Sequence, residues 1–81
     1  MNIYIGNLSY EVKESDLHKI MEEYGKVISA KLIVDRDSNR SKGFGFIEME
    51  NNADGLKAIQ ELNGKDYLGR PIVIKEAIPR D

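Results

Sequence analysis

Apolar and polar residues alternate along four stretches of the chain, and this two-residue period is typical of strands that bury one face. The four predicted strands are residues 2–6, 27–34, 43–50 and 71–76. The second is rich in β-branched residues, and the fourth begins with Pro71, where a missing amide is tolerated. The alternation predicts that the core-facing residues are Ile3, Ile5, Ala30, Leu32, Gly45, Ile47, Met49, Ile72 and Ile74.

Two stretches between these strands repeat apolar residues at the three- and four-residue spacing of an amphipathic helix. The first predicted helix spans residues 14–24, with Ser15 as a candidate N-cap and Gly25 as its stop. The second spans residues 52–62 and ends before an Asn-Gly pair, with an unfavourable glycine at position 55. The predicted inward residues are Leu17, Ile20, Met21 and Tyr24 in the first helix, and Ala53, Ala58, Ile59 and Leu62 in the second.

The order of the predicted elements is strand–helix–strand–strand–helix–strand (βαββαβ). Two helices with one apolar face each can cover only one face of a four-stranded sheet. This order predicts an α+β protein with a ferredoxin-like fold, in which a four-stranded antiparallel sheet carries both helices on one face. The 81 residues are enough for one domain, predicted at residues 1–77, with residues 78–81 as a short C-terminal tail.

The alternation also defines the residues on the sheet face that no helix covers. They are Tyr4, Ser29, Lys31, Ile33, Phe44, Phe46, Glu48, Val73 and Lys75. Leaving a large apolar side chain in water forfeits roughly 1.5–3 kcal/mol of burial, so three rings on one open face need an explanation. Two explanations stay open at this point: a partner chain or the tail covers the rings, or flat ligands such as nucleobases stack on them.

The charge of the chain limits how it could hold nucleic acid. A formal net charge of −2 argues against a strongly basic protein held mainly by charge, although a basic face can coexist with an acidic back. Five basic side chains flank the rings or lie on or beside the polar loop at residues 35–41: Lys31, Lys75, Arg36, Arg40 and Lys42. We interpret Gly43 and Gly45 as openings that let a nucleotide approach the rings.

Other chemistry finds little support in the chain. The absence of cysteine excludes a disulfide or a thiolate zinc site, and the only histidine, His18, lies within a predicted helix. The GFG sequence lacks the third glycine of a dinucleotide-binding loop, and DRDSN is not followed by the glycine of a calcium loop. We therefore expect no enzymatic activity, no cofactor and no metal.

The sequence also bears on location and assembly. No apolar run approaches the roughly 20 residues of a membrane span, and Met1 leads almost directly into the first strand, which leaves no room for a signal peptide. We expect no membrane association and a cytoplasmic protein, or a nuclear one if the chain is a eukaryotic fragment. We also expect a monomer. Leu68, predicted to be exposed in a turn, is a weak candidate for self-association, and a protein partner stays open.

Two motifs resemble those of a known family. Residues 42–49 read KGFGFIEM and resemble the RNP1 octamer of the RNA recognition motif (RRM), and residues 3–8 read IYIGNL and resemble its RNP2 hexamer. The resemblance implies the strand order 4-1-3-2 with both motifs on the central strands. It also implies base stacking by Tyr4, Phe44 and Phe46 and a basic contact by Lys42.

The resemblance extends over essentially the whole chain, with one departure. RNP1 usually ends in an aromatic residue, and here the position holds Met49, which the alternation turns toward the core. In size the chain resembles the compact single-RRM proteins of bacteria, and a domain of a larger eukaryotic protein is the alternative.

The sequence thus predicts a non-catalytic RRM that binds single-stranded RNA across its open sheet face and has a post-transcriptional role. The predicted RNA-binding residues are Tyr4, Phe44, Phe46, Lys42, Asn2, Lys31, Arg36, Arg40, Val73 and Lys75. Base-edge hydrogen bonds from side chains such as Asn2, Lys75 and Glu76, and from the tail, would select the RNA sequence.

Two alternatives stay open: an RRM whose sheet docks another protein, and binding of single-stranded DNA. An acylphosphatase-like enzyme on the same layout is disfavoured because residues 7–12 (NLSYEV) hold neither arginine nor glycine for a phosphate-cradling loop.

Overall fold

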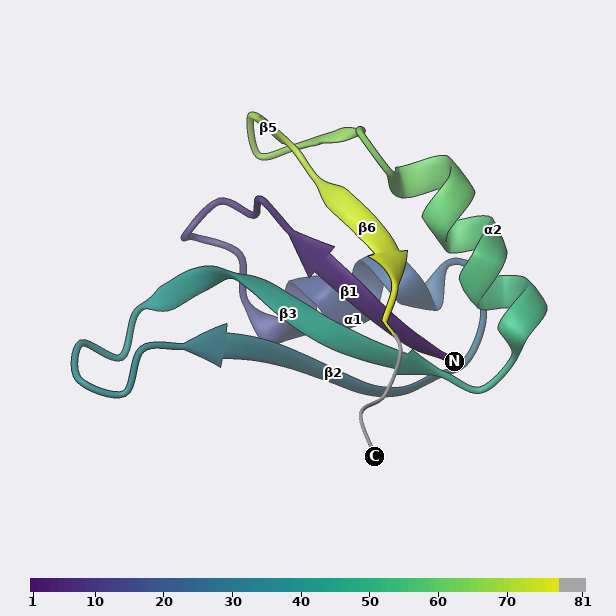
Figure 1. Cartoon of the computed structure of the whole chain (residues 1–81), viewed down its shortest axis with the longest axis horizontal. Coiled ribbons are helices and arrows are strands. Elements are labelled where there is room, and N and C mark those ends of the chain that lie inside the picture. Colours follow the sequence, from purple (N-terminus) through teal and green to yellow (C-terminus); the bar gives the residue numbers. More distant parts are fainter. Residues whose placement is uncertain (78–81) are drawn as a thin grey trace.

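The computed structural model, which describes residues 1–77, is a four-stranded antiparallel sheet with two helices on one face (Figure 1). The main elements are β1 (Asn2–Gly6), α1 (Glu14–Glu22), β2 (Val27–Val34), β3 (Ser41–Met49), α2 (Asn52–Leu62) and β6 (Val73–Glu76). The strands lie in the order β2-β3-β1-β6. This is the predicted order 4-1-3-2 read from the other edge, so the ferredoxin-like fold is confirmed.

The register of the strands aligns four side chains in one row across the open face. Tyr4 on β1 lies opposite Phe46 on β3 and opposite Lys75 on β6, and Phe46 lies opposite Lys31 on β2. Because side chains alternate between the two faces, this pairing puts all four on the same side of the sheet.

The core lies between the sheet and the helices. The strand residues predicted to face inward include Ile3, Ile5, Ile47, Met49, Ile72 and Ile74, and each is at most 2% exposed. Leu17 and Met21 from α1 and Ala58 and Leu62 from α2 complete this cluster. The connection between β1 and α1 adds Leu8 and Val12, which are buried although no periodic pattern marks them.

At each edge of the sheet, a side chain accepts one backbone amide proton. On β2, the amide of Leu32 donates to the Glu14 carboxylate of α1 at 3.1 Å. On β6, the amide of Ile74 donates to the Asn63 side-chain oxygen, also at 3.1 Å. An unpaired edge amide would otherwise be open to pairing with another chain. These bonds give the Asn-Gly pair after α2 and the first turn of α1 a structural role.

The helices differ from the prediction at their ends. The α1 helix ends at Glu22 rather than residue 24, and its N-cap is Lys13 rather than Ser15. The backbone amide of Lys13 donates to the Asp16 carboxylate at 2.9 Å, which satisfies a group that the helix leaves free. Asp16 thus supplies the N3 half of a capping box, and no side-chain hydroxyl caps the first turn.

The inward face of α2 also differs from the prediction. Ala53 is exposed, and Gly55 takes the inward position. A Cβ atom at Gly55 would collide with the Met1 Sδ atom and lie 3.4 Å from Ile3 Cδ1. A side chain at this position would therefore require the Met1 side chain to move away from α2.

The last predicted strand is divided in the structure. Pro71 belongs to a separate two-stranded ribbon of β4 (Asp66–Tyr67) and β5 (Arg70–Pro71), and the main sheet resumes only at Val73. The sequence did not indicate this ribbon, because each of its strands is too short to show alternation. None of the helices in the described part of the chain is long and apolar enough to cross a membrane.

The turn of this ribbon holds a leucine in an unfavourable backbone conformation. Tyr67 pairs with Arg70, and the two turn residues, Leu68 and Gly69, have φ angles of +52° and +85°. Two positive φ angles define a type I′ turn, which favours Asn-Gly over Leu-Gly because a leucine Cβ crowds the left-handed backbone. The Leu68 side chain is 56% exposed, as predicted, so little packing offsets this strain.

We predict that Leu68→Asn raises the free energy of unfolding by about 1 kcal/mol. Denaturant unfolding followed by circular dichroism measures the change. Leu56→Asn is the matched control because Leu56 is 50% exposed but helical, and there we expect a loss of about 0.5 kcal/mol. Equal losses in both variants would show that the turn conformation is not strained.

Candidate nucleic-acid interface

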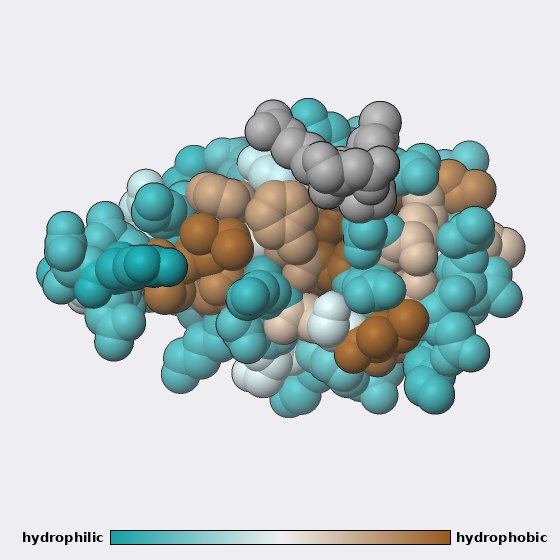
Figure 2. Space-filling model, turned by 60° about the horizontal axis from the view of Figure 1, so that its bottom comes forward, coloured by the Kyte–Doolittle hydropathy of each residue, from teal (hydrophilic) through white to brown (hydrophobic). Residues whose placement is uncertain are grey.

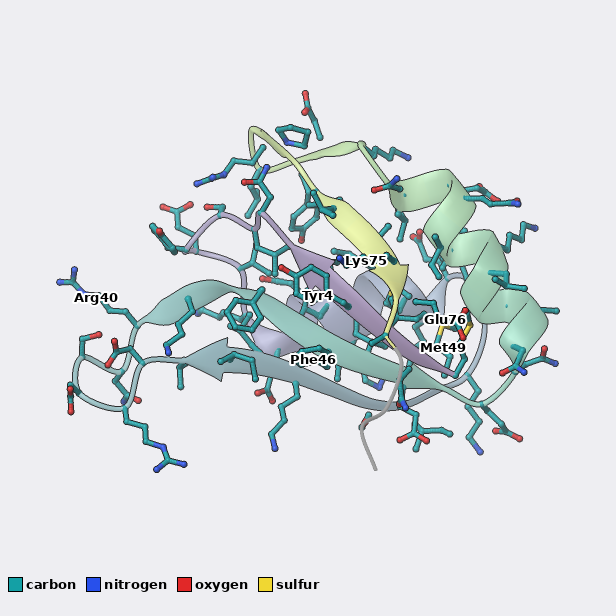
Figure 3. The ribbon with its side chains drawn as sticks, in the orientation of Figure 1. Tyr4, Arg40, Phe46, Met49, Lys75 and Glu76 are labelled. Carbon is teal, nitrogen blue, oxygen red and sulfur yellow. The ribbon has the colours of Figure 1, made fainter. Side chains whose placement is uncertain are left out.

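Three aromatic rings form one cluster on the sheet face opposite the helices. The ring centroids of Tyr4 and Phe44 are 6.0 Å apart with an interplanar angle of 29°. The Phe46 ring lies edge-on, 5.8 Å from Tyr4 and 6.2 Å from Phe44. We call Tyr4, Phe44 and Phe46 the ring cluster. Figure 3 shows Tyr4 and Phe46 side by side on the central strands.

The ring cluster is open to solvent. Phe46 is 41% exposed, and the other two rings are partly exposed. Figure 2 shows apolar side chains in the middle of the surface with hydrophilic side chains around them. The three rings pack against each other, and such pairs contribute about 0.5–1.5 kcal/mol beyond their area burial. Mutual packing therefore holds the rings in place while leaving part of their surface free to stack on a planar ligand.

Basic and apolar side chains flank the ring cluster. The Lys75 Nζ atom lies 5.4 Å from the centroid of the Tyr4 ring, within the range of a cation–π interaction. Lys31 is exposed on the opposite side, next to Phe46. Val73 is 44% exposed on β6, where it extends the apolar surface. The row therefore runs from a cation through two rings to a second cation.

A second, polar row lies beside the first. Asn2 on β1 and Ser29 on β2 each pair with Glu48 on β3. These side chains line a groove of about 280 Å³ together with Phe46, Lys31, Ile47 and Ala77. We call this the Glu48 groove. A base on Phe46 would have hydrogen-bonding groups along one edge.

The other end of the ring cluster meets two residues that the sequence reasoning missed. Tyr10, in the β1–α1 connection, is 70% exposed, and Arg70 belongs to the β4–β5 ribbon. Both line a pocket of about 180 Å³ with Tyr4, Phe44 and Lys42. The exposed ring of Tyr10 follows the RNP2-like stretch directly, but no strand or helix period marks it. Its position could be found only from the folded chain.

Asn7 connects this end of the sheet to the ribbon. It has a φ of +56°, which asparagine tolerates better than most residues, and its side-chain amide donates to the Pro71 carbonyl at 2.6 Å. The Arg70 guanidinium donates to the Asn7 side-chain oxygen at 2.7 Å. These bonds keep a cation beside the ring cluster.

The two arginines of the β2–β3 loop are less well placed than Lys42 to contact a ligand on the ring cluster. The Asp35 amide donates to the Arg40 carbonyl at 2.7 Å, which closes the loop. Arg36 and Arg40 are both exposed, and Figure 3 shows Arg40 pointing away from the ring cluster. Among the basic residues predicted for this region, Lys42 is the one that lines the pocket shared by Tyr4, Tyr10 and Phe44.

The two glycines of the RNP1-like stretch have different surroundings. A Cβ atom at Gly45 would collide with the Lys31 carbonyl oxygen and lie 3.2 Å from Leu17 Cδ1. Gly43 has a φ of +84°, and a Cβ atom there would lie 3.3 Å from the Leu8 carbonyl oxygen. The interpretation as an opening for a nucleotide is therefore wrong for Gly45, because protein atoms occupy the space beside it. For Gly43, which lines the pocket that also holds Tyr4 and Phe44, it stays a prediction.

A further cavity lies on the helix side, away from the ring cluster. It measures about 270 Å³ and is lined by Lys19, Ile20, Glu23, Leu62, Lys65, Asp66, Tyr67 and Ile72. Burial raises the pKa of the Tyr67 phenol, so that group stays protonated at neutral pH. The single ring of this cavity, Tyr67, lies with two lysines and two carboxylates, whereas the open sheet presents three rings in one cluster.

Comparison with known proteins identifies the family. The family model of the RNA recognition motif matches residues 3–73. The chain belongs to the RNA recognition motif family. Residues 42–49 and 3–8 therefore are its RNP1 and RNP2 motifs, and the ring cluster lies on the two strands that carry them.

Relatives and solved structures agree with this assignment. RbpE of Nostoc sp. (strain PCC 7120), whose name assigns it to RNA binding, is 47% identical over 81 residues, covering all of this chain and 82% of RbpE. The 29 kDa chloroplast ribonucleoprotein of Arabidopsis thaliana is 47% identical over 78 residues, covering 96% of this chain and 23% of that protein. The crystal structure of RNA-binding protein PG1 superimposes with a TM-score of 0.96 at 49% identity, covering 100% and 98% of the two chains. The Rna15 RRM with bound RNA (GU) does so with a TM-score of 0.87 at 28% identity, covering 99% and 85%.

The Asp35 carboxylate adds to the backbone hydrogen bonds that order the β2–β3 loop. Asp35 accepts a hydrogen bond from the Asp37 amide at 2.8 Å and a longer one from the Ser38 amide at 3.4 Å. These bonds, and to a lesser extent the charge of Lys42, lower the pKa of Asp35 below its ordinary value of 3.8. A lowered pKa in the folded state means that the stabilisation is present above 3.8 and is lost as the pH falls through the folded-state value.

We predict that the carboxyl carbon of Asp35, followed by NMR, titrates with a midpoint below 3.8. The amide resonances of Asp37 and Ser38 should shift with the same midpoint, because protonation weakens the bonds they donate. Asp35→Asn keeps an accepting oxygen, so the loop should stay ordered while this acid-dependent shift disappears. A midpoint at or above the ordinary value would show that the turn does not stabilise the carboxylate.

Proposed function

We propose that the protein binds single-stranded RNA by stacking two or three bases on the ring cluster. One observation carries the proposal: three rings within about 6 Å of one another lie on the uncovered face of the sheet, and two of them, Tyr4 and Phe46, lie in a row that ends in a lysine on each side. Base–aromatic stacking needs a flat, solvent-accessible ring and a nearby cation for the phosphate. The RNA-binding names of relatives such as RbpE, and the RNA bound to the Rna15 RRM, support the same choice of ligand.

Stacking supplies most of the binding free energy in this proposal. Each stacked base contributes roughly 1–3 kcal/mol, so three give a gross 3–9 kcal/mol before the cost of ordering the strand. Micromolar affinity corresponds to about −8 kcal/mol and is a reasonable ceiling for one such domain. The net charge of −2 agrees with a binding free energy that comes mainly from stacking, since counterion release contributes little when few cations meet the backbone.

The proposed binding residues are those expected from the sequence, but we assign them unequal contributions to RNA binding. Tyr4, Phe44 and Phe46 stack the bases, and Lys31, Lys42 and Lys75 lie close enough to meet the phosphates between them. Asn2 and Val73 border the bases. Arg36 and Arg40 extend the site only where a longer RNA follows the β2–β3 loop. To these we add Tyr10 and Arg70, which continue the surface beyond Phe44.

The biological setting belongs to the same proposal. We place a monomeric, non-catalytic protein in the cytoplasm, where it takes part in post-transcriptional handling of RNA. Within residues 1–77 no cluster of three histidine, cysteine or acidic side chains could hold a metal ion. The predicted contribution of the C-terminal tail lies outside the described residues. A sheet that docks another protein and a preference for single-stranded DNA are the competing functions.

We predict that Phe44→Ala combined with Phe46→Ala weakens binding of short RNA at least tenfold, because two stacking surfaces are lost. Fluorescence anisotropy with a labelled pool of single-stranded RNA measures the affinity. Circular dichroism checks that the variant remains folded, since Phe44 is partly buried. Leu56→Ala, on the outer face of α2, is the control and should bind like the parent chain.

The same measurement separates the competing functions. Unchanged affinity in the double variant would contradict the stacking proposal. No binding by the parent chain at high micromolar RNA would favour a protein-docking sheet. Matched DNA that competes as well as RNA would favour a general single-strand binder, because 2′-hydroxyl contacts distinguish the two nucleic acids.

We predict that Lys42→Gln reduces the salt dependence of binding by about 0.7 in the slope of log K against log salt, the value for one lost contact to single-stranded phosphate. Titrations at several salt concentrations measure this slope. Lys57→Gln changes the net charge equally but lies on exposed α2, so its slope should match that of the parent chain. Equal slopes in all three proteins would exclude Lys42 from phosphate contact.

A further inference from the structure

An acidic side chain borders the ring cluster on the proposed RNA surface. Glu48 is exposed on the central strand β3, two residues from Phe46 and on the same face. In the described part of the chain, no salt bridge or hydrogen bond engages its carboxylate, whereas Glu50 on the neighbouring turn pairs with Lys26. A carboxylate that repels phosphate is unexpected there unless it recognises another part of the nucleotide.

The geometry of the strand brings Glu48 next to a base on Phe46. Two residues along a strand span about 6.6–6.8 Å, so the edge of a base stacked on Phe46 extends toward Glu48. The cross-strand pairing adds Asn2 on one side and Ser29 on the other. All of these side chains, with Lys31, line the Glu48 groove. A base edge that enters the groove therefore meets an acceptor at its centre and neutral or cationic groups around it.

The chemistry of a carboxylate distinguishes among the four bases. An ionised carboxylate only accepts hydrogen bonds and matches two parallel N–H donors best. Guanine presents such a pair, its ring N1–H and its exocyclic amino group, with a carbonyl oxygen beside them. Adenine and cytosine each offer one amino group next to an accepting nitrogen. Uracil offers a single N–H between two carbonyl oxygens, which a carboxylate repels.

We propose that the Glu48 groove is a guanine subsite, in which Glu48 accepts both guanine donors while the base stacks on Phe46. Lys31 lies on the side where it can donate to the guanine carbonyl oxygen. Asn2 and Ser29 border the same edge. This inference rests on the proposed function, since it requires RNA to lie on the ring cluster.

The test uses five short RNAs that differ in one central nucleotide within a uridine background: guanosine, inosine, adenosine, cytidine or uridine. Anisotropy competition against the full chain gives relative affinities. We expect guanosine to bind about tenfold more tightly than uridine, within the range for a bidentate contact to one base. Inosine lacks the exocyclic amino group and should bind with intermediate affinity.

Two variants assign the preference to the carboxylate. Glu48→Gln retains the shape of the side chain but only one acceptor, and Glu48→Ala has none, so both should reduce the guanosine-to-uridine ratio below about threefold. Glu61→Gln is the matched control, because it removes the same charge from an exposed residue of α2. Its ratio should equal that of the parent chain.

Each outcome has a defined meaning. Binding of all five RNAs with equal affinity would overturn the guanine subsite and leave the proposed function intact. A guanosine preference that survives both Glu48 variants would also overturn it, because the base would then be selected elsewhere. Failure of the parent chain to bind any of the five would contradict the proposed function itself.

Discussion

Packing of both helices on the same side of the sheet is the constraint from which the site follows. The apolar faces of α1 and α2 cover the inward residues of all four main strands, and no further element in residues 1–77 is available for the other face. That face must therefore be stable in water. The ring cluster meets this requirement by internal contact, because each ring packs against the other two and Lys75 lies over one of them. A surface stabilised in this way needs little rearrangement to receive a planar ligand.

Alternation along single strands was enough to predict which rings are exposed, but not which residues meet across strands. Tyr4, Phe46, Lys31 and Lys75 come from four different strands, and their common row depends on strand order and register. The motif resemblance implied the order, whereas the register emerged only in the folded chain. Leu8, Val12 and Tyr10 escaped prediction for a related reason: they lie in irregular backbone, where no period exists to show which side chains turn inward. The β4–β5 ribbon was not predicted either, because strands of two residues each are too short to show alternation.

The glycines show how a correct pattern can lead to a wrong interpretation. The alternation placed Gly45 on the core face, yet its position between two exposed rings suggested a role in ligand access. In the structure its α-carbon packs against the Lys31 backbone and Leu17 of α1, so a side chain there would separate α1 from the sheet. Gly55 differs, since a Cβ atom there would meet only the flexible Met1 side chain closely. Close packing against a thin sheet, rather than contact with RNA, accounts for Gly45.

The charge distribution indicates how such a small acidic domain could discriminate among ligands. A strongly basic surface binds any polyanion and gains most of its affinity from counterion release, which carries no sequence information. Here the cations are few and lie around the rings, while Glu48 lies in the polar row beside them. Affinity then depends on the area of base stacking, and discrimination depends on the base edges that reach the polar row. A carboxylate beside the rings weakens binding to every phosphate, but it weakens binding least for a base that offers it hydrogen-bond donors. The acidic net charge and the acidic side chain on the open face therefore act in the same direction. Both lower the affinity for any phosphate backbone, so that the chemistry of the base edges decides which ligand binds.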